Sequence, residues 1–569
     1  MRAPEHALGA QRRIGSPLWL VGVLAALCLL YLASALLIPI HQDYPIVDEP
    51  IYAEPALDYS ESGVVEISEF SAPNAVVETV LGGLLARLIA DDIGVLRLAS
   101  MLVTVASVPF MYVLCRGLGA SRHLAVLGSA VYLFTPLAFT LTHVFHTDPF
   151  ANSLLVIAAA SLVAVTARWR HPMYWLMVGS CAMAVGFLSR PQMLMVPAVA
   201  LFAWLRWGDR HRRFVGALLL VLPTVLVVIG HTLWITDVGE PFIRSLSRRD
   251  LFDRSVGNML KVGAETALSA GIYVGLSVLP LTPLLPLRWR SLFEGDTRRM
   301  AIYLAAGFLA MGVALSAAGI GPFDLQAWVS HSGLGGVDRS HLGSRPELPF
   351  FALVVITFLL YFTTYRLAMR VTQKWKSSPN PLGLKFILVL AAGFVAAVSI
   401  SSLPLHAHVL DRYWLPLVPL STAIGVSFAA THRLRASLAW IITIALAALS
   451  FVGTYDSFVA YREVNEYAKE LIDEGVDPLS LDAGASWAGA YFGPQDEDPI
   501  KGIRRLGPYW VRFYAVDSNP TQGIALSAVA GYEIIERRSY ESWLHPGTQY
   551  LYLVRSRPGQ PFYLDPNDL

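Results

Sequence analysis

Apolar stretches recur along the chain from near its N-terminus to about Tyr455, and most are roughly 16 to 24 residues long. A helix of that length crosses a hydrocarbon layer about 30 Å thick, and lipid offers no partner to an unpaired backbone group. The composition agrees, because 55% of the 569 residues are hydrophobic and only 15% are charged, which is unlike a soluble domain. About thirteen transmembrane helices are predicted, at Pro17 to Ile40, Val95 to Cys115, His123 to Leu141, Phe150 to Ala167, Met173 to Leu188, Met193 to Leu205, Phe214 to Trp234, Leu268 to Leu287, Ala301 to Ile320, Phe350 to Tyr365, Leu384 to Leu403, Tyr413 to Ala430 and Leu438 to Thr454.

The basic residues of the short loops predict how the chain is threaded through the bilayer. Cationic loops resist translocation and stay in the cytoplasm. With the N-terminus inside, the alternate loops carry most of the Lys and Arg, and the outward loop Ile235 to Ala267 is a partial exception with four arginines. We therefore expect a cytoplasmic N-terminus, an outward C-terminus and a first span retained as a signal anchor. The cytoplasmic loops carry Arg12, Arg13, Arg116, Arg122, Arg168, Arg170, Arg206, Arg210, Arg212, Arg213, Arg288, Arg290, Arg298, Arg299, Arg366, Arg370, Lys374, Lys376, Arg433 and Arg435.

The outward segments divide the chain into two expected domains. Residues 1–455 form a transmembrane domain whose first outward loop, 41–94, holds six Glu and five Asp but no Lys. Within that loop, apolar residues at helical spacing predict an amphipathic helix over Ala75 to Ala90 that lies along the interface. Residues 456–569 form a polar tail with a helical pattern followed by strand-like runs, which predicts a small extracytoplasmic α/β domain. The tail elements are expected at Tyr461 to Asp473, Ser480 to Asp482, Tyr532 to Arg537 and Tyr550 to Val554.

The three cysteines predict no disulfide framework. Cys28, Cys115 and Cys181 lie in or at the edge of spans, and the outward segments contain no cysteine. We interpret them as packing residues.

Two adjacent carboxylates, Asp48 and Glu49, follow the first span directly. A carboxylate at the edge of the bilayer stays near water while lipid lowers the dielectric on one side, so it can act as a general base or bind a cation. The alternative is that these acids simply populate a wet, acidic loop.

The turn before the fourth span carries His143, His146 and Asp148. An acid between two spans is costly to hold there and usually has a partner or a task. One alternative is that Asp148 caps the following helix, ahead of Pro149. Another is a zinc site formed by the three side chains, with His406, His408 and Asp411 in a later outward turn as further ligands.

The tight outward turn Ser189-Arg190-Pro191 holds a cation near the bilayer surface. A guanidinium there suits a phosphate, which it can bind through two parallel hydrogen bonds. The alternative is an arginine whose head reaches the lipid headgroups. Arg190 lies on the side that the other short loops leave poor in positive charge, which favours a functional role. Arg412, before Tyr413, is a second cation of this kind.

These segments together resemble the integral-membrane glycosyltransferases of the GT-C superfamily. The resemblance lies in an acidic pair followed by Tyr-Ala, an acid in the second outward loop, a basic-Pro turn and an Arg-Tyr start to a late span. It is nearest to the protein O-mannosyltransferases and the lipid A aminoarabinose transferase, a glycosyltransferase family 39-like group. This chain departs from them at Ala72-Pro73-Asn74-Ala75, where Pro-Pro-Leu is usual, and at Ser189-Arg190-Pro191, where Lys-Gly-Pro is usual. The matching segments are Asp48 to Ala53, Val95 to Ala99, His146 to Asp148, Ser189 to Pro191 and Arg412 to Pro419.

The resemblance implies a fold, a reaction and a location. The fold is an all-α polytopic GT-C membrane domain with the small C-terminal α/β domain. The reaction is the inverting transfer of a sugar from a polyprenyl-phosphate donor to a glycan, lipid or protein acceptor, on the outer face of a bacterial cytoplasmic membrane. The resemblance specifies no cofactor with certainty; a divalent cation is an alternative stabiliser of the leaving phosphate, and no nucleic acid is expected as a partner. The implied roles are Asp48 as base with Glu49 and Asp148 as further catalytic acids, Arg190 and Arg412 as donor-phosphate contacts, and Tyr52, His146 and Tyr413 as substrate contacts.

Two other function classes stay open on the sequence alone. A transporter or flippase of a lipid-linked sugar would place ionisable groups near the bilayer midplane. The spans here are almost free of charge in their middles, and the candidate charges gather at the outer ends. A metal-dependent lipid hydrolase would use His143, His146 and Asp148 but needs further ligands.

Overall fold

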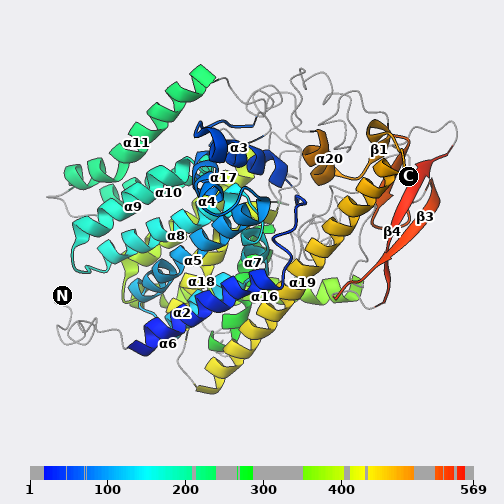
Figure 1. The fold of residues 1–569 in the computed structure, drawn as a ribbon. Helices are drawn as coiled ribbons and strands as arrows, with labels where there is room; N and C mark the ends of the chain where they lie inside the picture. Colours follow the sequence, from blue (N-terminus) through cyan, green and yellow to red (C-terminus); the bar gives the residue numbers. More distant parts are fainter. Residues whose placement is uncertain are drawn as a thin grey trace, which may run out of the picture.

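The computed structural model is mostly helical, with strands only near the C-terminal end of its described part (Figure 1). It describes residues 18–46, 48–68, 71, 74–207, 213–238, 266, 269–285, 350–402, 411–429, 433–492, 520–529, 531–543 and 547–557. The predicted span Ala301 to Ile320, the loop Gly321 to Pro349, most of the loop Ile235 to Ala267, and His406 and His408 lie outside these residues.

Several helices are long and apolar enough to cross a membrane, so the chain is a multi-pass membrane protein. In the described part of the chain there are six, or seven if the bent pair α6 (Arg122–Phe134) and α7 (Pro136–Thr142) counts as one span. That pair bends by 57° at Pro136, where the missing N–H and the ring interrupt the helix. The total of about thirteen spans stays a prediction. The six are α2 with η1 (Leu18–Ala33 and Ser34–Leu36), α5 (Ile93–Gly117), α8 (Thr147–Thr166), α11 (Arg213–Val238), α17 (Pro381–Ser402) and α19 (Arg433–Asp473).

Shorter apolar helices complete the bundle. They are α9 (Pro172–Phe187), η2 and α10 (Pro191–Leu194 and Met195–Trp207), the segment Ser269–Leu284 that ends in η4 (Leu279–Leu284), and α18 (Leu417–Phe428). A further helix, α16 (Phe350–Lys374), is followed by η6 (Trp375–Ser377).

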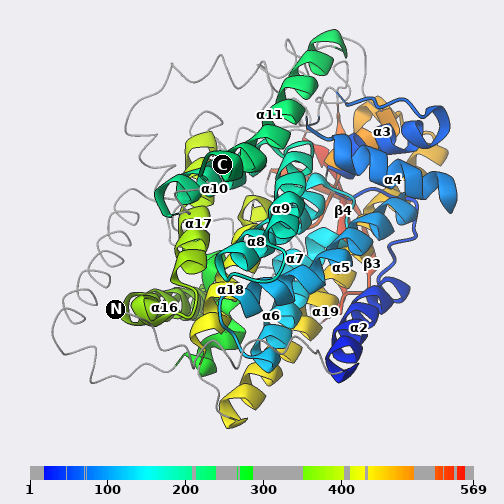
Figure 2. The same cartoon turned by 90° about the vertical axis from the view of Figure 1, so that its left-hand side faces the viewer.

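Helix α8 lies at the centre of the bundle, between α5 and α9 (Figure 2). In its most apolar stretch of 18 residues, 78% is buried inside the protein, whereas the corresponding share for α2, at the edge of the bundle, is 17%. Small side chains line much of α8, such as the buried run from Ala158 to Ala160, and they let its neighbours approach closely. The N-terminal end of this central helix begins with the segment that carries His146 and Asp148.

Two helices of the first outward loop, α3 (Glu49–Ser62) and α4 (Val76–Leu88), pack against each other above α5. Helix α4 coincides with the predicted amphipathic helix Ala75 to Ala90. A Cβ on Gly83 would lie 2.4 Å from the carbonyl oxygen of Ala56, so this contact requires glycine. Large apolar side chains of α4, such as Leu84 and Leu88, are exposed, as expected for a helix at the lipid interface.

The C-terminal segment contains a four-stranded sheet in the order β1-β2-β4-β3. The β1–β2 pair is parallel and the other two pairs are antiparallel. The sheet, α20 and the last turns of α19 share a second hydrophobic core, against which Ile51 of α3 also packs. The bounds are η8 (Pro478–Ser480), β1 (Leu481–Asp482), α20 (Ala485–Phe492), β2 (Gln522–Ala525), β3 (Tyr532–Tyr540) and β4 (Gln549–Ser556).

The expected domain boundary between residues 455 and 456 falls inside α19, which continues without a break to Asp473. One continuous helix therefore joins the apolar bundle to the C-terminal sheet. The division into two domains, and the independence of the outer one, stay predictions.

Candidate active site

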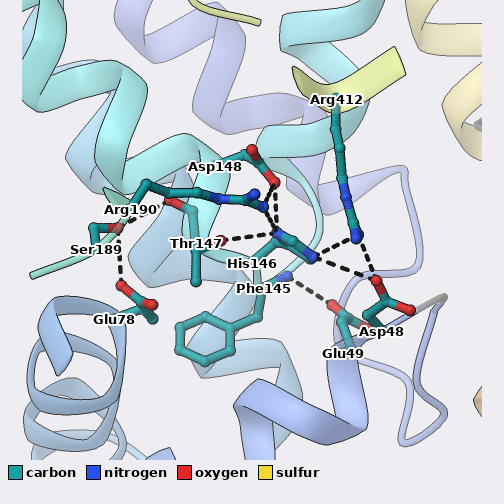
Figure 3. Close-up of polar contacts among 10 residues, drawn as sticks. All are labelled: Asp48, Glu49, Glu78, Phe145, His146, Thr147, Asp148, Ser189, Arg190 and Arg412. Carbon is teal, nitrogen blue, oxygen red and sulfur yellow. Dashed lines mark hydrogen bonds and ion pairs between the residues drawn. The ribbon is translucent and has the colours of Figure 1, made fainter. Parts of the chain in front are cut away.

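Four segments that are far apart in the sequence bring five charged or titratable side chains together (Figure 3). Asp48 precedes α3, and His146 and Asp148 flank the first residue of α8. Arg190 lies in the turn between α9 and η2, and Arg412 in η7 (Asp411–Trp414). The sequence predicted each of these residues as a site residue, and the fold places them in one cluster.

Each carboxylate of the cluster is paired with one arginine. Nη1 of Arg412 lies 2.5 Å from Oδ2 of Asp48. Nη2 of Arg190 donates to Oδ2 of Asp148. The Asp48 side chain keeps 24% of its surface exposed, whereas Asp148 and both arginines are more deeply buried. Asp48 is therefore the carboxylate of this cluster that a substrate reaches most easily.

His146 lies between the two ion pairs. Its Nδ1 is 2.7 Å from Oδ2 of Asp148, and its Nε2 is 2.8 Å from Nη1 of Arg412. The distance from Nε2 to Oδ2 of Asp48 is 3.8 Å. The imidazole is almost fully buried, and the ring of Tyr52 packs edge-on against it with ring centroids 4.6 Å apart.

The two arginines also lie over one aromatic ring. The guanidinium carbons of Arg190 and Arg412 are 5.4 Å and 5.8 Å from the ring centroid of Tyr413. A ring face attracts cations, so Tyr413 helps to hold two like charges near each other. The predicted substrate contacts Tyr52 and Tyr413 are thus both part of the cluster.

The charges within the cluster keep Asp48 and Arg412 ionised. Burial opposes the ionisation of Asp48, but Arg412 and His146 outweigh it and hold the pKa of Asp48 below its usual range. Burial likewise opposes the charge of Arg412, and Asp48 outweighs it, so the pKa of Arg412 is raised well above its usual value. Burial raises the pKa of the Tyr52 hydroxyl, which stays protonated. Asp48 is therefore a carboxylate and Arg412 a cation at any physiological pH.

Glu49 is turned away from the cluster and is fully occupied by other groups. Its two oxygens accept from Nε and Nη2 of Arg97 at 2.9 and 2.6 Å. They also accept from the backbone amides of Ile46 and Phe145, both at 2.7 Å. Glu49 and Arg97 are completely buried. The geometry therefore shows Glu49 as an anchor of the loop that carries Asp48, and a direct catalytic role for Glu49 stays an untested prediction.

The turn that carries Arg190 is held by the start of α4. The side-chain amide of Asn74 donates to the Phe187 carbonyl at 2.8 Å, and the Val76 amide donates to the Leu188 carbonyl at 2.9 Å. Oγ of Ser189 lies 3.0 Å from Glu78 and 3.0 Å from the carbonyl of Thr147 (Figure 3). The interfacial helix therefore fixes the position of the Arg190 guanidinium relative to α8.

The predicted metal set of His143, His146 and Asp148 is not formed. His143 faces the first span instead, where its Nε2 is 2.7 Å from Oγ of Ser34 and its Nδ1 is 2.6 Å from the Phe139 carbonyl. Within the described ranges, no group of three or more His, Cys, Asp or Glu side chains is arranged to hold a metal ion. Two guanidinium groups neutralise Asp48 and Asp148, so the cluster does not fit a divalent cation.

Sequence reasoning missed two buried charged residues, Arg97 and Glu78. Arg97 stands alone in the apolar run of α5, and a charge within a span predicts a buried partner. The lone arginine therefore indicated a buried acidic partner, but the sequence does not show which of the many acids of the first loop this partner is. Glu78 lies on the buried side of the amphipathic helix, and its position opposite Ser189 depends on how α4 is seated.

Comparisons with known proteins agree with the motif pattern. Residues 77–234 match the family described as dolichyl-phosphate-mannose-protein mannosyltransferase. This segment runs from the start of α4 into α11 and includes His146, Asp148 and Arg190. Comparison with curated proteins gave no match.

Solved structures of two membrane proteins are similar to this chain at low sequence identity. The archaeal oligosaccharyltransferase AglB from Archaeoglobus fulgidus, solved with an inhibitory peptide and a dolichol-phosphate, has 11% identity and a TM-score of 0.45 over 89% of this chain and 69% of that one. ArnT from Cupriavidus metallidurans, bound to undecaprenyl phosphate, has 14% identity and a TM-score of 0.39 over 94% of this chain and 98% of that one. The family match over residues 77–234 confirms the predicted resemblance of this chain to the integral-membrane glycosyltransferases of the GT-C superfamily.

Proposed function

We propose that this protein is a glycosyltransferase that moves a sugar from a polyprenyl-phosphate donor to an acceptor hydroxyl on the extracytoplasmic face of a bacterial cytoplasmic membrane. The observation that carries the proposal is the cluster itself. It combines one accessible carboxylate, Asp48, with its partner Arg412 and with the buried Arg190–Asp148 pair, at the N-terminal end of the central helix. A base for an acceptor and cations for a phosphate are the two components that this transfer needs.

Each of the two arginines can offer an N–H donor to a phosphate without leaving the cluster. Nε of Arg190 is buried and has no hydrogen-bond partner among the described residues. A guanidinium that keeps one edge on Asp148 can use this Nε–H for a phosphate oxygen. Arg412 can turn its Nη1 from Asp48 to the same phosphate, because that contact lies at the more exposed edge of the cluster.

The reaction is a single displacement. The acceptor oxygen attacks the anomeric carbon and forms the new glycosidic bond, while the bond from that carbon to the phosphate oxygen breaks with its electron pair on the phosphate. The acceptor proton passes to Asp48 as the oxygen becomes bonded to carbon. The configuration at the anomeric carbon inverts, because attack and departure are on opposite faces.

The protein lowers the barrier mainly through charge. Phosphate is a good leaving group, and the charge that develops on it is stabilised by Arg190 and Arg412 in a site that excludes most water. Asp48 needs little basicity, because a hydroxyl becomes strongly acidic once its oxygen begins to bond to carbon. A carboxylate whose pKa is held below its usual range stays ready to accept a hydrogen bond at every physiological pH.

The test combines transfer with lipid binding on the same purified protein in nanodiscs. Lipid-linked sugars extracted from the host membrane serve as donors in single-turnover assays, and undecaprenyl phosphate serves as the binding probe. Asp48→Asn keeps the shape of the side chain and loses its basicity, so transfer should fall by roughly a hundredfold or more while lipid-phosphate binding is kept. Asp43→Asn, an exposed acid of the same loop, is the matched control and should transfer normally.

Two outcomes would overturn the proposal. Transfer by Asp48→Asn at the wild-type rate would remove the base assignment. A wild-type protein that binds undecaprenyl phosphate but releases no sugar from any host lipid would remove the transferase function. The thermal unfolding of each variant is measured first, so that an unfolded variant is not mistaken for an inactive one.

A further inference from the structure

We propose that His146 is a proton-accepting residue of this reaction, and that its Nε2 takes over the acceptor proton from Asp48 once Arg412 has turned to the donor phosphate. The inference rests on the proposed function and deepens it. It assigns the group that receives the proton from Asp48.

The contacts of His146 determine which nitrogen carries hydrogen. Arginine only donates hydrogen bonds, so Nη1 of Arg412 at 2.8 Å requires a lone pair on Nε2. A neutral imidazole carries one N–H, which is then on Nδ1, 2.7 Å from Oδ2 of Asp148 and 3.4 Å from Nη2 of Arg190. The Arg412 contact therefore specifies the neutral tautomer with Nε2 as the basic atom. An imidazole oriented by a carboxylate at one nitrogen and free to accept a proton at the other is the usual arrangement of a histidine base.

One nitrogen of Arg412 contacts both proposed proton acceptors, Asp48 and His146. Nη1 of Arg412 contacts Oδ2 of Asp48 at 2.5 Å and Nε2 of His146 at 2.8 Å, and these two acceptors are only 3.8 Å apart. When Nη1 turns to a phosphate, both atoms lose a donor at the same moment. A small side-chain rotation then brings the two within hydrogen-bond distance. Arrival of the donor lipid therefore releases the pair of bases that activates the acceptor.

Asp48 is poorly suited to keep the proton. A carboxylate is a weaker base than an imidazole, so a proton on Asp48 passes readily to an imidazole that is within reach. His146 supplies the imidazole of the cluster. Imidazole is the side chain most often used to accept protons near neutral pH. The imidazolium that results lies between the carboxylates of Asp48 and Asp148, which stabilise its charge.

The step balances without any further reactant. The O–H bond of the acceptor breaks, the glycosidic C–O bond forms, and the electron pair of the departing C–O bond stays on the lipid phosphate. The proton moves from the acceptor oxygen to Asp48 and then to Nε2, and it leaves to water with the products. The charged and titratable groups that face His146 are Asp48, Tyr52, Asp148, Arg190 and Arg412.

The alternative is a positioning role, in which His146 only holds Asp148 and Arg412. The two roles differ in the pH dependence of single-turnover transfer at saturating donor. If His146 accepts the proton, the wild-type rate measured from about pH 5.5 to 8.5 should rise with pH and level off, because only a neutral imidazole can accept a proton. In His146→Gln this ionisation should disappear, the rate should fall by about a hundredfold or more, and binding of undecaprenyl phosphate should be kept within a few-fold. His143→Gln, a buried histidine of the preceding turn that contacts Ser34, is the control and should keep the wild-type profile.

Two results would overturn the inference. One is a wild-type rate that does not change with pH across that range, which needs no variant to fold. The other is His146→Gln with the ionisation still present. These results are distinguishable from failure of the proposed function, which would abolish transfer by the wild type or leave Asp48→Asn fully active.

Discussion

The buried pair of Glu49 and Arg97 gives the sharpest test of how the site is supported, through the change Glu49→Gln. Each carboxylate oxygen accepts two hydrogen bonds, one from Arg97 and one from a backbone amide. A glutamine keeps one oxygen and replaces the other with an amide nitrogen, which only donates. Two of the four hydrogen bonds are therefore lost, and a completely buried guanidinium loses its counter-charge.

The expected loss of stability is large. Removing one partner of a buried ion pair costs about 3 to 5 kcal/mol, because the other charge stays buried without compensation. Arg97 also donates to the carbonyls of Ile40, Gln42 and Tyr44, so it cannot leave the interior without breaking the loop that carries Asp48. Glu54→Gln, an exposed carboxylate of the same helix, should change stability by only about 0.5 kcal/mol.

Thermal unfolding in one detergent, with transfer measured on the same preparations, separates an anchor from a catalyst. We expect Glu49→Gln to unfold well below both the wild type and Glu54→Gln. At temperatures where it is still folded, its lipid-phosphate binding should remain. If Glu49→Gln unfolded at the same temperature as Glu54→Gln and had nevertheless lost transfer, Glu49 would act on the chemistry and the anchor role would be refuted.

Three further predictions follow from the threading, the lipid contact and one buried acid. Reporter fusions after Arg210 and after Tyr461 should report the cytoplasm and the outside respectively, and finding both on one side would refute the threading. Arg190→Ala should weaken binding of undecaprenyl phosphate by about 1.5 to 3 kcal/mol in a titration, with Arg190→Lys recovering part of the loss; unchanged binding in both would make Arg190 a headgroup anchor. Burial raises the pKa of Glu78 well above its usual value, so its stabilising contribution is present at low pH and is lost as the pH rises through the folded pKa. Glu78→Gln should therefore unfold at a progressively higher temperature than the wild type as the pH rises from about 4.5, and a gap that does not depend on pH would contradict this.

The sequence was most informative where one local rule decides the outcome. Apolar runs predicted α5, α8 and α11, and charged residues in the turns next to the spans, among them Asp48, Asp148 and Arg190, were predicted as site residues. It was least informative where a partner is distant in the chain. The pairing of Glu49 with residue 97 depends on how α3 and α5 pack, and no spacing rule reports that.

Two other differences arise from local geometry that a residue pattern does not reveal. His143 and His146 are three residues apart, but the bend at Pro136 and the end of α7 turn His143 towards Ser34 of the first span. Strand β2 (Gln522–Ala525) is short and contains a glycine, so its alternation was too brief to detect, and its pairing with β1 and β4 is what defines it.

The uninterrupted helix α19 has a mechanical consequence for the site. Its 41 residues make a rod about 60 Å long that enters the outer core at one end and the membrane bundle at the other. The same outer core contacts Ile51, three residues after Asp48. One unbroken helix and one shared hydrophobic core therefore hold the C-terminal sheet at a fixed distance from the segment that carries Asp48.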